Sequence, residues 1–144
     1  MKRTATAHWT GDVQTGQGNL TTMSGTLSDT PYSFKARFQN DDGKGGTNPE
    51  ELIAAAHAGC FTMALSAALT KAGFTADSLH TTAEVDMRPS ENGFSIEAIA
   101  LNLQATIPTI SAEQFQELAQ DAKANCPVSK ALAAVPISMT AELV

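Results

Sequence analysis

A long run without charged side chains most constrains what this chain can fold into. From Leu52 to Thr70, nineteen consecutive residues include no Lys, Arg, Asp or Glu, and alanine dominates the run. The four residues before it, Asn48-Pro49-Glu50-Glu51, combine an N-cap residue, a proline suited to the first helical position and two acids that complement the helix dipole. We therefore expect one helix of about 24 residues that starts here and stops at Gly73.

The same run is long enough to raise the question of a membrane span. Its alanines, and the interrupting His57, Thr62 and Ser66, would gain little free energy on transfer to lipid. We expect instead a helix wrapped by protein on all sides, and no membrane partner. The charged fraction of 17%, against about 25% in an average domain, favours an oligomer that covers uncharged surface.

Length and charge exclude further classes of function. A chain of 144 residues has the usual size of one domain, so we expect a single domain over residues 1–144. With 9 Lys and Arg against 15 Asp and Glu, the net charge is −6 and there is no basic run, so nucleic acid is a poor partner. The first residues lack the apolar stretch of a secretory signal, and we expect a cytoplasmic protein.

The segments on either side of the helix predict strands and shorter helices, hence an α+β protein. The first forty residues favour an antiparallel meander of two or three strands. In residues 32–38 apolar and polar residues alternate, which predicts a strand with Arg37 pointing away from the aromatic face, and a flexible loop should follow over 40–47. Further along we expect a hairpin of strands 79–87 and 94–107 with a bulge in the second, helices over 111–124 and 126–134, and a closing strand over 137–143.

Two cysteines, Cys60 and Cys126, are the strongest candidates for chemistry. In a reducing compartment cysteines are more often catalytic or metal-binding than structural. Cys60 lies mid-helix, where a buried core thiol is the ordinary interpretation, and a thiolate there would need a cation such as Arg37. Cys126 precedes Pro127 at a helix start, where backbone N–H groups favour an ionised sulfur. A peroxidatic and resolving pair is one interpretation, but a spacing of 66 residues does not show that they meet.

Glu50 and His57 have ordinary explanations beside functional ones. Glu50 and Glu51 suit the first turn of a helix. Ten residues separate Glu50 from Cys60, about 15 Å along one helix, so these two side chains could share a site only if two copies of the helix packed antiparallel in a dimer. His57 and Cys60 would supply two of the four usual zinc ligands, so a core or interface histidine is favoured over a metal site.

Two runs, Thr47 to Phe61 and Asn125 to Ser129, closely resemble the OsmC and Ohr family, and the likeness extends over essentially the whole chain. The resemblance implies the OsmC-like fold: antiparallel sheets with a long central helix that carries the reactive cysteine, in an intertwined homodimer with its sites at the subunit interface. It implies no cofactor and no metal.

The resemblance also implies an activity, a thiol-dependent peroxidase that reduces organic hydroperoxides to alcohols. Cys60 would be the peroxidatic cysteine and Cys126 the resolving one, while Arg37 and Glu50 orient and ionise Cys60. The resulting Cys60–Cys126 disulfide would be recycled by an external dithiol, for example of lipoyl type, and no catalytic role falls to His57. A binding module for a small apolar ligand and a structural dimer with incidental thiols remain alternatives.

Overall fold

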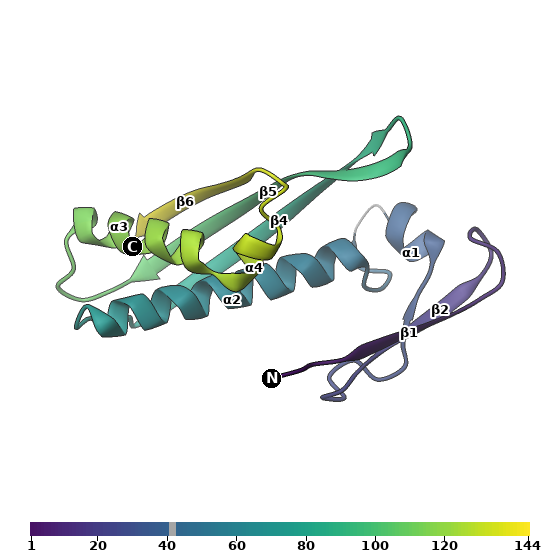
Figure 1. The fold of residues 1–144 in the computed structure, drawn as a ribbon, viewed down its shortest axis with the longest axis horizontal. Helices are drawn as coiled ribbons and strands as arrows, with labels where there is room; N and C mark the ends of the chain where they lie inside the picture. Colours follow the sequence, from purple (N-terminus) through teal and green to yellow (C-terminus); the bar gives the residue numbers. More distant parts are fainter. Residues whose placement is uncertain (41–42) are drawn as a thin grey trace. The chain divides into compact units, whose positions relative to one another are not determined.

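The computed structural model describes residues 1–40 and 43–144 (Figure 1). These residues divide into two compact units, Met1–Pro49 and Glu50–Val144. One domain over residues 1–144 stays a prediction. The loop expected over 40–47 includes residues 41–42, which lie outside the described residues.

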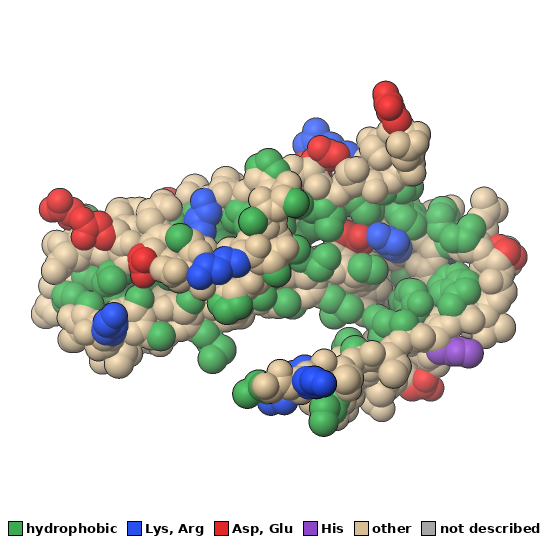
Figure 2. Space-filling view, viewed as in Figure 1, with side chains coloured by type: hydrophobic (Ala, Val, Ile, Leu, Met, Phe, Trp, Pro, Cys, Tyr) green, Lys and Arg blue, Asp and Glu red, His purple; other side chains and the backbone are tan. Residues whose placement is uncertain are grey.

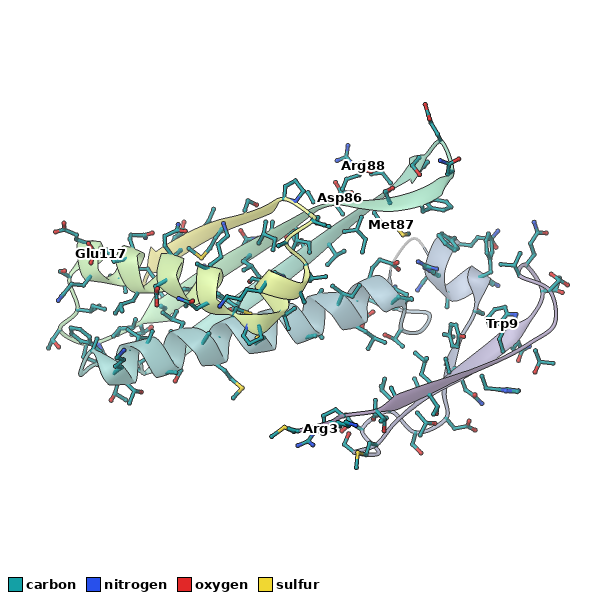
Figure 3. All side chains as sticks on the ribbon, in the orientation of Figure 1. Arg3, Trp9, Asp86, Met87, Arg88 and Glu117 are labelled. Atoms are coloured by element: carbon teal, nitrogen blue, oxygen red, sulfur yellow. The ribbon has the colours of Figure 1, made fainter. Side chains whose placement is uncertain are left out.

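The first unit is built on an antiparallel sheet of three strands. Its strands are β1 (Ala5–Thr10), β2 (Gln17–Thr22) and β3 (Thr30–Tyr32), in the order β1-β2-β3, which confirms the expected meander. Trp9, labelled on β1 in Figure 3, packs against Tyr32 with ring centroids 5.3 Å apart. Gly18 lies between the two rings, and a Cβ there would come within 2.7 Å of the indole, so the close packing of the rings requires glycine.

The strand predicted over residues 32–38 is wrong. The chain forms a short helix instead, α1 (Phe34–Phe38), because the Ser33 side chain accepts a hydrogen bond from the Ala36 N–H at 3.1 Å and caps the helix. Phe34 and Phe38 then lie one turn apart, with ring centroids at 4.8 Å. Arg37 does not point away from the aromatic rings, since its guanidinium carbon lies 4.9 Å from the centroid of the Phe38 ring.

The second unit contains the long helix and a second sheet. Its elements are α2 (Pro49–Lys71), β4 (Ser78–Ser90), β5 (Gly93–Thr106), α3 (Ala112–Asn125), α4 (Pro127–Ala131) and β6 (Ile137–Leu143). Helix α2 begins at the proline as predicted, and Gly73 follows it with φ +87. The register of β4 against β5 shifts beside Glu97, which confirms the bulge predicted for the second strand of the hairpin. Helix α4 is shorter than the predicted helix over 126–134.

The sheet of the second unit is mixed rather than wholly antiparallel. Its strand order is β4-β5-β6, with β4 and β5 antiparallel but β6 parallel to β5. A parallel neighbour requires a crossover connection, and α3 and α4 provide it (Figure 1). The alternation of the closing strand predicted β6 correctly but carried no information on its direction.

The core of the second unit lies between one face of the sheet and the two longer helices. Alternate residues of β5 pack against α2 and α3, and the buried cluster consists of Phe61, Leu65, Leu69, Leu101, Leu103, Ala105, Ile107, Phe115, Ala119, Ala122 and Cys126. The opposite face of the sheet is polar, with side chains such as Thr82, Asn102 and Thr140. The sheet and α3 therefore contact α2 on one face of the helix.

The other face of α2 is exposed in a single chain, so the predicted wrapping of this helix by protein on all sides stays a prediction. Ala55, Gly59, Met63 and Ala67, spaced by one turn, are all exposed and form what we call the α2 stripe. Figure 2 shows hydrophobic side chains over the region of α2. By length and composition alone α2 could cross a membrane, with a mean hydropathy of 1.7 and 22% of its apolar window buried. An apolar helix face of this length needs a cover.

Candidate active site

The sulfur of Cys126 is fixed by the junction of two helices. The Cys126 N–H donates to the Ala122 carbonyl at the end of α3, and the Cys126 carbonyl accepts from the Lys130 N–H at the start of α4. Pro127 occupies the first position of α4, where its lack of an N–H costs nothing. Both backbone groups of Cys126 are thus engaged, and its side chain is fully buried in the core cluster.

The two cysteines meet in the second unit. The Cys60 Sγ and Cys126 Sγ atoms are 2.8 Å apart, and both residues are free thiols. Cys60 is half-buried, so this sulfur is open to a reactant, whereas Cys126 is not. Because a disulfide S–S bond is about 2.05 Å long, only a small movement separates this contact from a covalent bond.

The surroundings of the two sulfurs push their pKa values in opposite directions. Burial raises the pKa of the Cys60 thiol, and the adjacent Cys126 raises it further. Burial also raises the pKa of Cys126, but hydrogen bonds from the Cys60 thiol, from the Ser129 N–H and hydroxyl and from the Val128 N–H outweigh it, so the pKa of Cys126 is lowered. These surroundings favour the thiolate form of Cys126 over that of Cys60.

A buried histidine lies in the same part of the second unit. The His57 Nε2 atom is 2.8 Å from the Ser129 Oγ atom, and neither side chain is more than slightly exposed. Burial lowers the pKa of His57, so the ring is neutral at neutral pH. His57 is thus a core residue, as the sequence favoured, and its partner is a serine from α4.

Arg37 and Glu50 are placed by different elements. Arg37 lies on α1 in the first unit, at the wall of an apolar pocket of about 240 Å³ formed with Trp9, Val13, Tyr32, Ser33, Phe34, Phe38 and Pro49. Glu50 lies in the first turn of α2. A guanidinium in an apolar pocket can hold a polar group of a ligand whose remainder is a hydrocarbon.

Among the described residues, 1–40 and 43–144, no three His, Cys, Asp or Glu side chains form a group that could hold a metal ion. The arrangement of Cys60 and Cys126 instead permits thiol and disulfide chemistry, in which a nucleophilic sulfur is oxidised and a second sulfur bonds to it.

Ser129 was missed as a candidate by reasoning from residue types. It is the third residue after Cys126, so it occupies the position whose N–H and side chain turn back towards an N-cap residue. That spacing is a readable signal once Cys126 is taken as the N-cap. Its bond to His57, however, joins residues 72 positions apart and could be found only in the structure.

Comparison with known proteins identifies the family. The OsmC-like protein family matches residues 40–140. The chain is 51% identical over 128 residues to the Escherichia coli protein named peroxiredoxin OsmC, covering 89% of this chain and 87% of that one. It is 30% identical over 115 residues to the organic hydroperoxide resistance protein OhrB of Bacillus subtilis, covering 79% and 80%.

Solved structures agree on the fold. The structure of Bacillus subtilis OhrB superposes with a TM-score of 0.67 at 29% identity, over 98% of each chain. An OsmC-like protein of Vibrio cholerae superposes with a TM-score of 0.78 at 15% identity, over 99% of each chain, and this likeness concerns the fold alone. With a matching family over most of its length and a relative at half identity, the chain belongs to the OsmC-like protein family.

Proposed function

We propose that this protein is a thiol-dependent peroxidase that reduces organic hydroperoxides to alcohols. The observation that carries the proposal is the 2.8 Å contact between Cys60 Sγ and Cys126 Sγ, with the first half-buried and the second fully buried. The relatives named peroxiredoxin OsmC and organic hydroperoxide resistance protein OhrB support it.

In the first step the Cys60 thiolate attacks the distal oxygen of the hydroperoxide. The O–O bond breaks, the alkoxide leaves and takes a proton to become the alcohol, and Cys60 becomes a sulfenic acid. In the second step the Cys126 thiolate attacks the Cys60 sulfur, and the S–O bond breaks with release of water after protonation. An external dithiol, for which a lipoyl group is one candidate, then reduces the Cys60–Cys126 disulfide to two thiols.

The first step needs a cation at Cys60, because burial and Cys126 raise the pKa of that thiol. We assign this role to Arg37, with Glu50 orienting its guanidinium. The apolar pocket around Arg37 supports an organic substrate, since an alkyl group buried against Trp9 and Phe34 gains free energy that hydrogen peroxide cannot.

The homodimer belongs to this proposal. The exposed α2 stripe combines the small residues Ala55, Gly59 and Ala67 with the larger Met63, and Gly59 has open space above it among the described residues. A second copy of α2 can approach such a face closely and bury it. The proposed dimer would place its sites at the interface of the two subunits and would work in the cytoplasm, where dithiol reductants keep the thiols reduced.

The experiment that tests the function follows the consumption of an alkyl hydroperoxide in single and in repeated turnovers. The wild-type protein should consume cumene hydroperoxide repeatedly with dihydrolipoamide as reductant, and Cys60→Ser should consume none. Arg37→Met should slow the first step by about tenfold or more, because a lost charge-assisted contact to a thiolate is worth about 1.5–3 kcal/mol.

Three outcomes would contradict the proposal. Peroxide consumption that persists in Cys60→Ser would remove the assigned nucleophile. Thiols that resist peroxide until the protein is denatured would identify a structural dimer, and reversible binding of an apolar ligand without thiol oxidation would identify a binding module. Ser78→Ala, at the exposed first residue of β4, is the control for a substitution remote from the thiols.

A further inference from the structure

The two sulfurs differ in access, and this difference decides how a disulfide between them can be opened. Cys126 is 0% exposed and belongs to the buried cluster of the second unit, whereas Cys60 is half-buried. Cys60 also directly follows the exposed Gly59 on α2, above which the described residues leave open space. An external thiolate can therefore reach Cys60 but not Cys126.

The direction of attack agrees with this difference in access. A thiolate approaches one disulfide sulfur in line with the bond that breaks, so a reductant at Cys60 arrives from the side away from Cys126. The sulfur that leaves is then Cys126, whose surroundings favour its thiolate. A thiol of lower pKa leaves faster, so the leaving group also favours attack at Cys60.

The expelled sulfur stays beside the bond that has just formed. In the structure the Cys126 Sγ atom lies 2.8 Å from Cys60 Sγ, and both backbone groups of Cys126 are engaged by hydrogen bonds at the junction of α3 and α4. A nucleophile held in contact reacts as if its concentration were roughly 10⁵–10⁸ M. Cys126 can therefore attack Cys60 again, restore the disulfide and expel the reductant.

We propose that Cys126 is a specificity-determining residue for the reductant. The reductant attacks Cys60, and Cys126 then expels every thiol that cannot leave as a cyclic disulfide. This inference rests on the proposed function and deepens it, because it assigns the sulfur that is attacked and explains why a dithiol is needed rather than two monothiols.

The steps balance in atoms and electrons. The first thiolate of the dithiol bonds to Cys60 Sγ, and the Cys60–Cys126 bond breaks with its electron pair on Cys126 Sγ. The second thiolate of the same molecule attacks the reductant sulfur, which closes a ring and releases the Cys60 thiolate. The dithiol loses two electrons, and its two protons pass through solvent to the two cysteines. A monothiol needs a second molecule from solution, which is slower than the return of Cys126.

The first test compares a dithiol with a monothiol on the disulfide of the wild-type protein, formed with diamide. Dihydrolipoamide and 2-mercaptoethanol are added at equal thiol concentration, and acid quench, alkylation and mass spectrometry follow the loss of the disulfide. Reduction by 2-mercaptoethanol should be slower by about a hundredfold or more. Equal rates would overturn the inference.

The second test removes the returning nucleophile. In Cys126→Ser, Cys60 is converted to its mixed disulfide with 2-mercaptoethanol by treatment with hydroxyethyl disulfide. Both reductants should now free Cys60 at similar rates, and a hundredfold preference for the dithiol that persists would overturn the role of Cys126. Cys126→Ala, with a small apolar side chain suited to a buried position, repeats the measurement if the serine variant does not fold.

The third test determines which sulfur an external reagent reaches. Cys60 in Cys126→Ser should react with Ellman's reagent at least about tenfold faster than Cys126 in Cys60→Ser, and Cys126 should react readily only in urea. The opposite order in the folded variants would overturn attack at Cys60. None of the three tests uses peroxide, so their failure would leave the proposed peroxidase standing, whereas loss of peroxide consumption alone would leave this inference standing.

Discussion

At the scale of single residues, the two cysteines differ in what surrounds sulfur atoms that touch each other. Burial and the adjacent Cys126 raise the pKa of Cys60 against the Val128 N–H, which lowers it, whereas burial raises the pKa of Cys126 and hydrogen bonds with Cys60, Ser129 and Val128 lower it. These surroundings favour the thiolate of Cys126, which is fully buried, over that of Cys60. A peroxidase that uses Cys60 as its nucleophile needs a positive charge near Cys60 to stabilise the thiolate of that residue. This is the role proposed for Arg37.

The charge on Cys126 makes a prediction about pH. Cys126→Ser removes both the thiolate and the hydrogen bond that raise the pKa of Cys60, so the pKa of Cys60 should fall. The rate of the first oxidation, measured against pH with one equivalent of cumene hydroperoxide, should reach its plateau at lower pH than in the wild-type protein. A plateau at higher pH would contradict the assignment of the first charge to Cys126. Turnover should stop after one peroxide per site, and the product should be a stable sulfenic acid.

At the scale of elements, α2 carries Cys60 and Cys126 caps the start of α4, so these two helices together position the pair of sulfurs.

The sequence predicts the helix cap at residues 48–51, the glycine after α2 and the bulged hairpin, because each depends on a few neighbouring residues with strong local preferences. It does not predict the helix at 34–38, since aromatic residues at positions 34 and 38 fit one face of a strand as well as one face of a helix. The hydrogen bond from the Ala36 N–H to the Ser33 side chain, together with the backbone bond from Arg37 to Ser33, distinguishes the two.

Contacts between elements that lie far apart in the sequence could not be predicted from the sequence alone. Alternation shows that β6 is a strand but leaves its partner and direction open. In the same way, the helical positions of Cys60 and Cys126 give each a local environment, whereas their contact depends on how α3 returns the chain to α2. Ser129 was overlooked because its importance comes from His57, which lies on another helix.

Burial of His57 makes the stability of the folded protein depend on pH in the acid range. Burial lowers the folded-state pKa of His57 below its ordinary value of 6.5, so below about pH 6.5 the unfolded chain binds a proton that the folded chain does not. The free energy of unfolding should therefore decrease as the pH falls through this value. His57→Gln should abolish that part of the decrease, as measured by urea unfolding at several pH values, whereas His80→Leu should keep it. An identical pH dependence in wild-type and His57→Gln proteins would contradict a neutral buried ring.

At the scale of the whole molecule, the exposed face of α2 is the feature that one chain leaves incomplete. Lipid or a second copy of the chain could cover it, and the residues of the stripe distinguish these. Alanine and glycine gain little from lipid but allow two helices to approach closely. The proposed dimer would also account for the low charged fraction of the chain, because surface that meets another subunit needs no charges.

The oligomeric state is therefore the strongest test at this scale. Ala67→Glu places a charge in the exposed α2 stripe, where it would be buried without a partner in a dimer but solvated in a monomer. Sedimentation velocity should show a dimer for the wild-type protein and monomers for Ala67→Glu, and peroxide turnover should fall with the dimer. Gln104→Glu adds the same charge to the exposed polar face of the sheet and should leave both dimer and turnover intact. Oxidation of Ala67→Glu by diamide should still form the Cys60–Cys126 disulfide, because both sulfurs and the helices that hold them lie in one unit of one chain. A monomeric wild-type protein with full turnover would disprove a site shared between subunits, and would leave the α2 stripe as a surface for some other partner.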